Sequence, residues 1–247
     1  YTNLILGGSN AFYSISAKQL SNSTNENWYN LSISAEGYSN LNYYSFLEEN
    51  LSYSQRLKIK KVLYSTIYYY RKGSLELRKN SSKLIDGSNK FSIKPNFSGL
   101  TYIKRFLNSG RIIPQYPKQN KFGDIVFLEN ICKNKNIKQN FVIEEIDLII
   151  NDISNKFKKL NDIFPNAEIY IIFPSDFIYK KNIINYQKQI KNLKFFIEIN
   201  KNQFIKKNNI LFQEPFSYEQ LCDTPSHANP NGNKWRTNNI YLKLLKT

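Results

Sequence analysis

Histidine and cysteine are scarce in this chain. It contains one histidine, His227, and two cysteines, Cys132 and Cys222, with no C-x-x-C spacing. These counts exclude a framework of several disulfides and a cysteine-based zinc site, and they argue against a zinc enzyme with paired histidine ligands. We expect no metal and no cofactor. We expect the two cysteines to be separate thiols, with one disulfide as the alternative if the protein is exported.

Long apolar segments are also missing. No apolar run approaches the roughly 18 residues that a membrane-spanning helix needs, and no signal peptide is visible. The chain begins at Tyr1 rather than at Met. We therefore expect a further N-terminal segment, which is where a membrane anchor would lie.

Acidic residues are few beside the basic ones: 19 Asp and Glu face 35 Lys and Arg, for a net charge of +16. Such a charge fits a nucleic acid, an anionic glycan or a membrane surface as partner. The lysines are spread along the chain, and Lys, Asn, Ile and Tyr are abundant throughout, as an AT-rich coding sequence produces. We therefore expect no nucleic-acid partner.

The remaining composition is that of a folded α/β protein. With 247 residues and 41% hydrophobic residues, the chain can bury a substantial core as a single domain over 1–247. Apolar runs followed by glycine turns and helical periodicity predict a parallel sheet with helices on both faces. We expect strands over 3–6, 28–33, 61–70, 168–174 and 194–199. We expect helices over 10–20, 41–47, 137–164 and 179–193, and a last helix after 232. Residues 71–136 lack periodicity and are predicted to be an insertion or lid-like excursion after the third strand.

Two stretches at opposite ends of the chain carry candidate chemistry. Leu4 to Asn10 runs from an apolar strand through Gly7-Gly8 to Ser9 at a helix start, where a helix N-terminus favours negative charge. Asp223 lies four residues before His227 in a loop rich in Pro and Asn. Histidine can take and return a proton near neutral pH, and a carboxylate can orient it. Ser9 can be a plain helix cap and His227 a structural residue, but together these stretches favour a serine acyl-transfer site.

A family resemblance rests on these stretches. The Gly-Gly-Ser block, a glycine after the second strand, and the string from Cys222 to Gly232 with Arg236-Thr237 resemble the SGNH (GDSL-like) hydrolase superfamily. Within it, the C-terminal string is similar to bacterial cell-surface glycan O-acyltransferases and teichoic-acid D-alanyl transfer proteins. The matched motifs cover about a fifth of the chain. The resemblance implies a flavodoxin-like three-layer α/β/α sandwich around a parallel sheet.

The resemblance also implies residue roles. Ser9 would be the nucleophile, His227 the general base and Asp223 the residue that orients the imidazole. The backbone N–H groups of Ser9 and Gly37 would form an oxyanion hole. The family's Gly-x-Asn-Asp block is missing after the third strand. Candidates for the third oxyanion donor are Asn40, Ser65 and Thr66, and the sequence does not choose among them.

The expected function is therefore an O-acyltransferase, most simply an O-acetyltransferase, that modifies a bacterial surface polysaccharide through a Ser9 acyl-enzyme. Its partners would be an acyl donor, either a thioester or a membrane-bound carrier, and a glycan acceptor that can be anionic. The alternatives are a carbohydrate O-acetyl esterase of the same fold and a non-catalytic glycan-binding member. We expect the protein in the bacterial cell envelope or on the periplasmic side, with the cytoplasm as the alternative.

Overall fold

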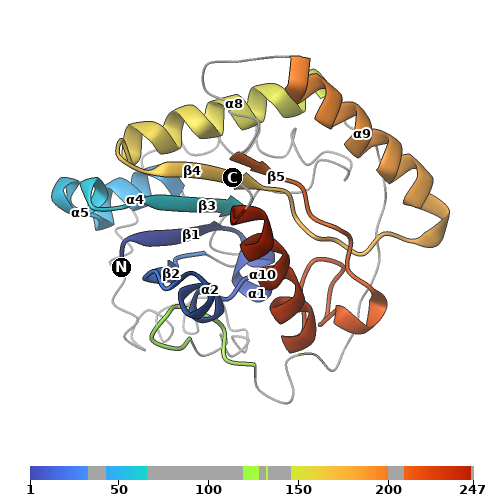
Figure 1. Cartoon of the computed structure of the whole chain (residues 1–247), viewed down its shortest axis with the longest axis horizontal. Helices are drawn as coiled ribbons and strands as arrows, with labels where there is room; N and C mark the ends of the chain where they lie inside the picture. The colour runs from blue at the N-terminus through green and yellow to red at the C-terminus, as the bar shows by residue number, and fades with distance from the viewer. Residues whose placement is uncertain (33–42, 66–118, 128–131, 133–145, 200–208, 246–247) are drawn as a thin grey trace, which may run out of the picture.

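A five-stranded sheet, parallel throughout, forms the centre of the molecule (Figure 1). The computed structural model describes residues 1–32, 43–65, 119–127, 132, 146–199 and 209–245. The strands are β1 (Asn3–Gly7), β2 (Trp28–Asn30), β3 (Lys61–Ser65), β4 (Glu168–Ile172) and β5 (Ile210–Leu211). Their spatial order is β2-β1-β3-β4-β5, which is the flavodoxin-like order that the resemblance implies.

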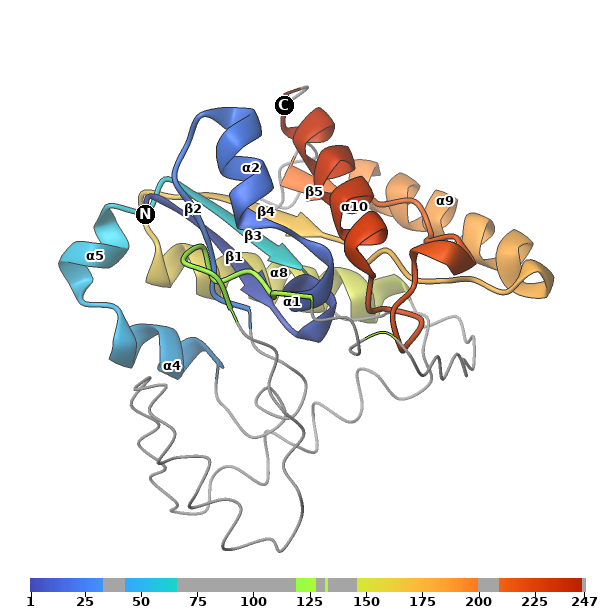
Figure 2. The same cartoon turned by 90° about the horizontal axis from the view of Figure 1, so that it is seen from below.

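Helices cover both faces of this sheet, so the predicted α/β/α sandwich is confirmed. The helices are α1 (Ser9–Ser14), α2 (Ala17–Thr24), α4 (Tyr43–Asn50), α5 (Tyr53–Leu57), α8 (Ile146–Ile163), α9 (Ile183–Ile199) and α10 (Pro230–Leu244), with 3-10 turns at Lys180–Asn182 and Tyr218–Gln220. Figure 2 shows α2 and α10 on one side of the sheet and α8 on the other. Each face therefore has its own apolar layer.

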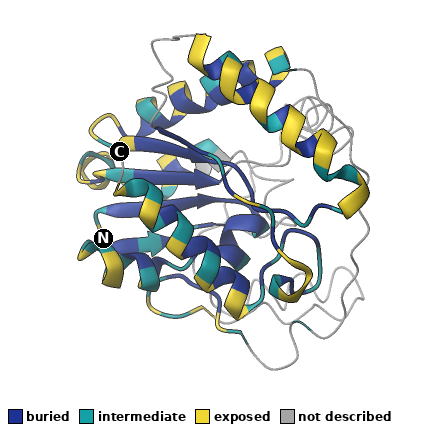
Figure 3. Cartoon of the chain, turned by 45° about the vertical axis from the view of Figure 1, so that its right-hand side comes forward, coloured by how far each residue is buried: buried dark blue, intermediate teal, exposed yellow. Residues whose placement is uncertain are grey.

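The strands read as nearly continuous apolar runs because both of their faces are buried. Leu4 and Leu6 of β1 point into the core under α8, where they join Ile153. Ile5 between them points to the opposite core, which Ile240 of α10 completes. The strands are accordingly buried along most of their length, as Figure 3 shows.

The order of the strands determines where a ligand would bind. In an open parallel sheet, ligands bind beyond the carboxyl ends of the strands, where the strand order reverses, here between β1 and β3. Gly7 at the end of β1 is in register with Ser65 at the end of β3. Gly7 has φ of +141°, and an added Cβ would lie 2.8 Å from the Ser65 carbonyl oxygen. Glycine is therefore required at the point where the chain turns from β1 into α1.

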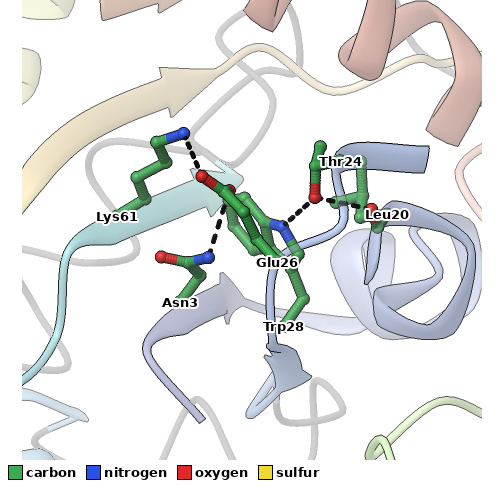
Figure 4. A network of polar contacts seen from close by, with 6 residues as sticks. All are labelled: Asn3, Leu20, Thr24, Glu26, Trp28 and Lys61. Atoms are coloured by element: carbon green, nitrogen blue, oxygen red, sulfur yellow. Dashed lines mark hydrogen bonds and ion pairs between the residues drawn. The ribbon is translucent and has the colours of Figure 1, made fainter. Parts of the chain in front are cut away.

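The opposite, amino ends of β1 and β3 are joined by a polar network (Figure 4). Glu26 accepts hydrogen bonds from Asn3, at 3.2 Å, and from Lys61, at 2.7 Å. Beside it, the Trp28 indole donates to the Thr24 hydroxyl at 3.0 Å. This network holds β1, β2 and β3 together at their amino ends, which lie opposite the Gly7–Ser65 pair.

One predicted helix proves to be two. The helix expected over 10–20 is interrupted at Ile15, whose backbone is extended, and α2 restarts after Ser16. The Ser16 N–H donates to the Thr237 hydroxyl, and its side chain accepts from Gln19. Asp124 accepts from the N–H groups of Ala17 and Lys18. Thr237 and Asp124 lie more than 100 residues from this break. The apolar periodicity of 10–20 therefore carried no sign of it.

The prediction of a strand over 194–199 is wrong. Those residues are the last turns of α9, which runs to Ile199, and the fifth strand is β5 instead. Tyr186, Gln189, Leu193 and Ile197 are buried at helical spacing on one side of α9. The β-favouring run Phe195-Phe196-Ile197 is therefore held in a helix by packing against the sheet.

The other predicted elements match in part. The predicted strands over 28–33 and 168–174 correspond to β2 and β4, which end at Asn30 and Ile172. The described part of the strand predicted over 61–70 is β3, and 66–70 lies outside the described residues. Helix α4 lies where a helix was expected over 41–47. The described helix α8 begins at Ile146, and all of 137–145 lies outside the described residues. Most of the predicted excursion over 71–136 also lies outside them. Its described part, 119–127, contacts β2 through a hydrogen bond from the Asn30 N–H to the Phe122 carbonyl, 2.8 Å long.

The expectation of two separate thiols is also wrong. Cys132 and Cys222 form a disulfide. Cys222 is fully buried next to Asp223. Because 90 residues separate the two cysteines, their contact depends on the fold, and nothing in their spacing indicated the pairing.

Candidate active site

Ser9 lies at the switch point of the sheet. It is the first residue of α1, directly after the Gly7 turn, and it is partly exposed. Gly8 caps the helix without a side chain, and its carbonyl accepts from the N–H groups of Ala11 and Phe12. The N–H and the hydroxyl of Ser9 make no hydrogen bond within the described part of the chain. The Ser9 N–H lies in the first turn of α1, where the helix itself does not use the backbone N–H groups.

His227 and Asp223 are brought together as predicted. The Nδ1 atom of His227 lies 2.8 Å from Oδ1 of Asp223. The loop that carries them is closed at its base, where the Cys222 N–H donates to the His227 carbonyl over 2.7 Å and Leu221 pairs with Ala228. The loop leads directly into α10, whose first turn is capped by the Asn229 side chain. The imidazole and the carboxylate are thus held by a short closed loop.

The charge of Asp223 follows from its surroundings. Burial alone would raise the pKa of its carboxyl group, but the hydrogen bond and the positive charge of His227, together with the N–H groups of Asp223 and Thr224, outweigh burial and lower this pKa. The group is an ionised acceptor at neutral pH. Since a carboxylate can only accept, Nδ1 of His227 carries the proton, and Nε2 is left with the lone pair that a base needs.

Tyr13 links this pair to α1. Its ring stacks on the His227 imidazole, with centroids 4.2 Å apart and planes 7° from parallel. Tyr13 follows Ser9 by four residues, which places the two side chains on one face of α1 with Cβ atoms about 5–6 Å apart. His227 therefore packs against the residue that lies one helical turn after Ser9 in α1. No direct hydrogen bond joins Ser9 to His227 among the described residues, and in unliganded enzymes such bonds are often longer than in the substrate complex.

A buried arginine packs beneath the start of α1, next to Ser9. Arg236 of α10 is fully buried and donates to the Asn10 carbonyl, at 2.8 Å, to the Ser65 hydroxyl, at 3.0 Å, and to the Phe173 carbonyl, at 3.4 Å. It thereby joins the start of α1 to the carboxyl ends of β3 and β4. The Asn10 amide also donates to Ser65, over 3.0 Å. Arg236 and Asn10 thus fix the position of the Ser9 backbone.

Sequence reasoning missed Tyr13 and assigned no role to Arg236. Tyr13 could have been found from its spacing of four residues after Ser9. Arg236 could have been found from its helical spacing, because it lies on the same face of the last helix as Asn233 and Ile240, and both of these are buried.

The predicted oxyanion donors are only partly described. Gly37, Asn40 and Thr66 lie outside the described residues. Ser65 is described and fully buried, and its oxygen accepts from both Asn10 and Arg236. The hydroxyl proton of Ser65 is the donor that this side chain could offer to an oxyanion.

The described residues contain no group of three His, Cys, Asp or Glu side chains that could hold a metal ion. No described helix is both long enough and apolar enough to cross a membrane. The candidate site consists of Ser9 at the switch point of the sheet and the His227–Asp223 pair in the loop before α10.

Comparison with known proteins adds two solved structures. One is a family two carbohydrate esterase from Clostridium thermocellum, solved in complex with cellohexaose, with a TM-score of 0.46 and 8% identity. The other is an acetyl xylan esterase from the rumen bacterium Butyrivibrio proteoclasticus, with a TM-score of 0.44 and 12% identity. Each match covers 99% of this chain and 63% of the other. No family model matches the chain, and no curated protein matches it.

Proposed function

We propose that this protein is an SGNH-type serine enzyme that forms an acyl-enzyme on Ser9 and passes the acyl group to or from a carbohydrate. The observation that carries the proposal is the His227–Asp223 pair, whose imidazole stacks on Tyr13, one helical turn after Ser9 in α1. The location at the β1/β3 switch point supports it.

The proposed reaction has two halves, acylation and deacylation of Ser9, and His227 and Asp223 act in both. His227 Nε2 takes the proton of the Ser9 hydroxyl while Oγ attacks the acyl carbonyl. The oxyanion forms beside the Ser9 N–H, and His227 returns its proton to the departing alcohol or thiol, which leaves an acyl-serine. A second hydroxyl then gives its proton to His227 as it attacks the ester carbonyl, and the bond between Ser9 Oγ and the acyl group breaks as His227 returns that proton to Oγ. Asp223 stays ionised and stabilises the imidazolium.

The second hydroxyl decides the name of the activity. We propose a sugar hydroxyl of a bacterial surface polysaccharide, which makes the protein an O-acyltransferase, most simply an O-acetyltransferase. The tyrosines offer flat faces for sugar rings, and the excess of lysine and arginine suits an acidic glycan. If water attacks instead, the same residues make a carbohydrate O-acetyl esterase. A non-catalytic glycan-binding member would keep the fold without the Ser9 chemistry.

The first test is hydrolysis of p-nitrophenyl acetate by the purified chain. We expect turnover that Ser9→Ala and His227→Ala each abolish, while circular dichroism stays unchanged. The matched control is Ser54→Ala, which removes an exposed hydroxyl at a distant helix. Wild-type turnover that persists in both site variants would refute the Ser9 acyl-enzyme.

The second test follows the acyl group. The enzyme is incubated with an acetyl thioester, with and without acidic oligosaccharides, and the products are analysed by mass spectrometry. A Ser9-dependent gain of one acetyl mass on the sugar supports the transferase. If the enzyme only removes acetyl groups from an acetylated oligosaccharide, the esterase is the correct assignment.

A further inference from the structure

The Cys132–Cys222 disulfide is attached to the loop of the candidate site. Cys222 is fully buried and immediately precedes Asp223, and its N–H donates to the carbonyl of His227. The disulfide therefore links the loop from 222 to 227 covalently to Cys132, in a part of the chain that precedes α8. Such a link bears on the site only if other contacts do not already fix both residues of the pair.

The His227 end of the loop has several anchors of its own. The Ser14 hydroxyl donates to the Ser226 carbonyl over 3.2 Å, and the Phe177 N–H donates to the Pro225 carbonyl over 2.8 Å. The imidazole itself stacks on Tyr13. These contacts come from α1 and from the segment after β4. They fix His227 from outside the loop whether or not the disulfide is present.

The Asp223 end is held differently. The groups that stabilise its carboxylate are His227 and the N–H groups of Asp223 and Thr224, which all belong to the loop. Its side chain is 36% exposed, against 15% for His227. The neighbouring residue, Cys222, is held both by the hydrogen bond from its N–H to the His227 carbonyl and by the disulfide, and of these two contacts the disulfide is the one that reaches outside the loop. The position of the carboxylate relative to the fixed imidazole therefore depends on where Cys222 is held.

We propose that Cys222, through its disulfide to Cys132, is a positioning residue that keeps Asp223 in hydrogen-bonding register with His227. The consequence for catalysis rests on the proposed function, whereas the effect on the imidazole does not. Loss of the disulfide leaves His227 in place and loosens the carboxylate. Because the carboxylate sets the orientation of the base and not the binding of substrate, kcat falls while KM stays nearly the same.

The experiment uses Cys132→Ser, which breaks the disulfide at its less buried end, outside the loop. His227 is the one histidine of the chain, so imidazole signals in a ¹⁵N-edited NMR spectrum need no assignment. We expect the signal of the proton on Nδ1, bonded to Asp223, to weaken and the ring signals to move toward those of Asp223→Asn. For p-nitrophenyl acetate we expect kcat to fall about 10- to 100-fold, with KM changed less than about twofold.

The control separates positioning from general stability. Ile153→Ala opens the core under α8, on the sheet face opposite α10, and lowers the melting temperature without touching the loop. It should leave the imidazole signals and kcat unchanged at temperatures where it is folded. Reduction of the wild-type protein by dithiothreitol, which converts the disulfide to two thiols as the reagent closes into its own cyclic disulfide, should reproduce the Cys132→Ser signals.

The outcomes are distinct. Unchanged imidazole signals in Cys132→Ser and in the reduced protein would overturn the proposal. So would unfolding of both where wild type and Ile153→Ala stay folded, because the disulfide would then hold the whole fold. If the wild-type protein shows no turnover, the proposed function fails, and the NMR result still decides whether Cys222 positions Asp223.

Discussion

At the scale of single residues, the site depends on how a few polar groups divide their hydrogen bonds. With Asp223 ionised, the Nδ1–H of a neutral His227 imidazole donates a hydrogen bond to the carboxylate, so Nε2 is the nitrogen that can act as a base. Arg236 lies fully buried behind this arrangement and connects α1 with β3 and β4. In the proposed mechanism the loop from 222 to 227 supplies the base, and Arg236 bonds the backbone next to Ser9.

Asp223→Asn tests the role of the carboxylate. The amide keeps the shape but can present its NH₂ group to Nδ1, which favours the wrong imidazole tautomer. We expect kcat to fall by up to about 10⁴-fold with little change in KM. The measurement is steady-state hydrolysis of p-nitrophenyl acetate, with His227→Ala as the inactive reference. A variant as active as wild type would remove Asp223 from the mechanism.

The same substitution changes stability in acid. The folded protein holds the pKa of Asp223 below its ordinary value, so this group stabilises the fold above its unfolded pKa, about 3.9, and loses that contribution as pH falls through the lower folded pKa. We expect the wild-type protein to be more stable than Asp223→Asn above about pH 5, and the difference to shrink below about pH 4. Urea unfolding across this range measures it. A difference that grows in acid would contradict the sign.

Gly7→Ala tests the turn that leads to Ser9. The positive φ disfavours any side chain, and the new Cβ would lie 2.8 Å from the Ser65 carbonyl. We expect a loss of at least about 2 kcal/mol in the free energy of unfolding. Gly8→Ala is the matched control, because Gly8 has φ of −90°, and it should cost less than about 1 kcal/mol. Equal losses in urea denaturation would show that the conformation of Gly7 is not the cause.

At the scale of elements, distant contacts decide where the helices end. The break between α1 and α2 is set by Thr237 and Asp124, which bond the backbone around Ser16. Asp124 is nearly fully buried, and burial raises the pKa of its carboxyl group although hydrogen bonds from Lys18, Ala17 and Ser16 oppose this. The segment 119–127 therefore contributes to the N-terminal cap of α2.

Asp124→Ala tests this cap. It leaves the buried N–H of Ala17 and the partly buried N–H of Lys18 without their acceptor, and we expect a loss of about 2 kcal/mol in the free energy of unfolding. The control is Glu26→Gln in the network of Figure 4, whose bridge to Lys61 is about one-third exposed and should contribute less than about 1 kcal/mol. If Asp124→Ala is as mild as this control in urea denaturation, the cap is not important for stability.

At the scale of the whole molecule, the net charge of +16 calls for a test of polyanion binding. The basic residues are dispersed and the sequence contains no evident Lys/Arg-rich recognition helix. We expect a random DNA duplex to bind with Kd of about 10⁻⁴ to 10⁻⁶ M at physiological salt and to weaken steeply as salt rises. Fluorescence anisotropy with a labelled duplex measures this. A sub-micromolar complex at physiological salt would restore nucleic acid as a partner.

The sequence alone determined the fold class and the pairing of His227 with Asp223. Parallel strands buried on both faces show up as apolar runs, and a residue pair within one short loop depends on local spacing. Only the tertiary structure decided the Cys132–Cys222 disulfide, the division of α1 from α2 and the place of 194–199 in a helix. It also decided that Tyr13 and Arg236 belong to the site. Each of these depends on contacts between residues far apart in the chain, where packing and buried hydrogen bonds override local propensity.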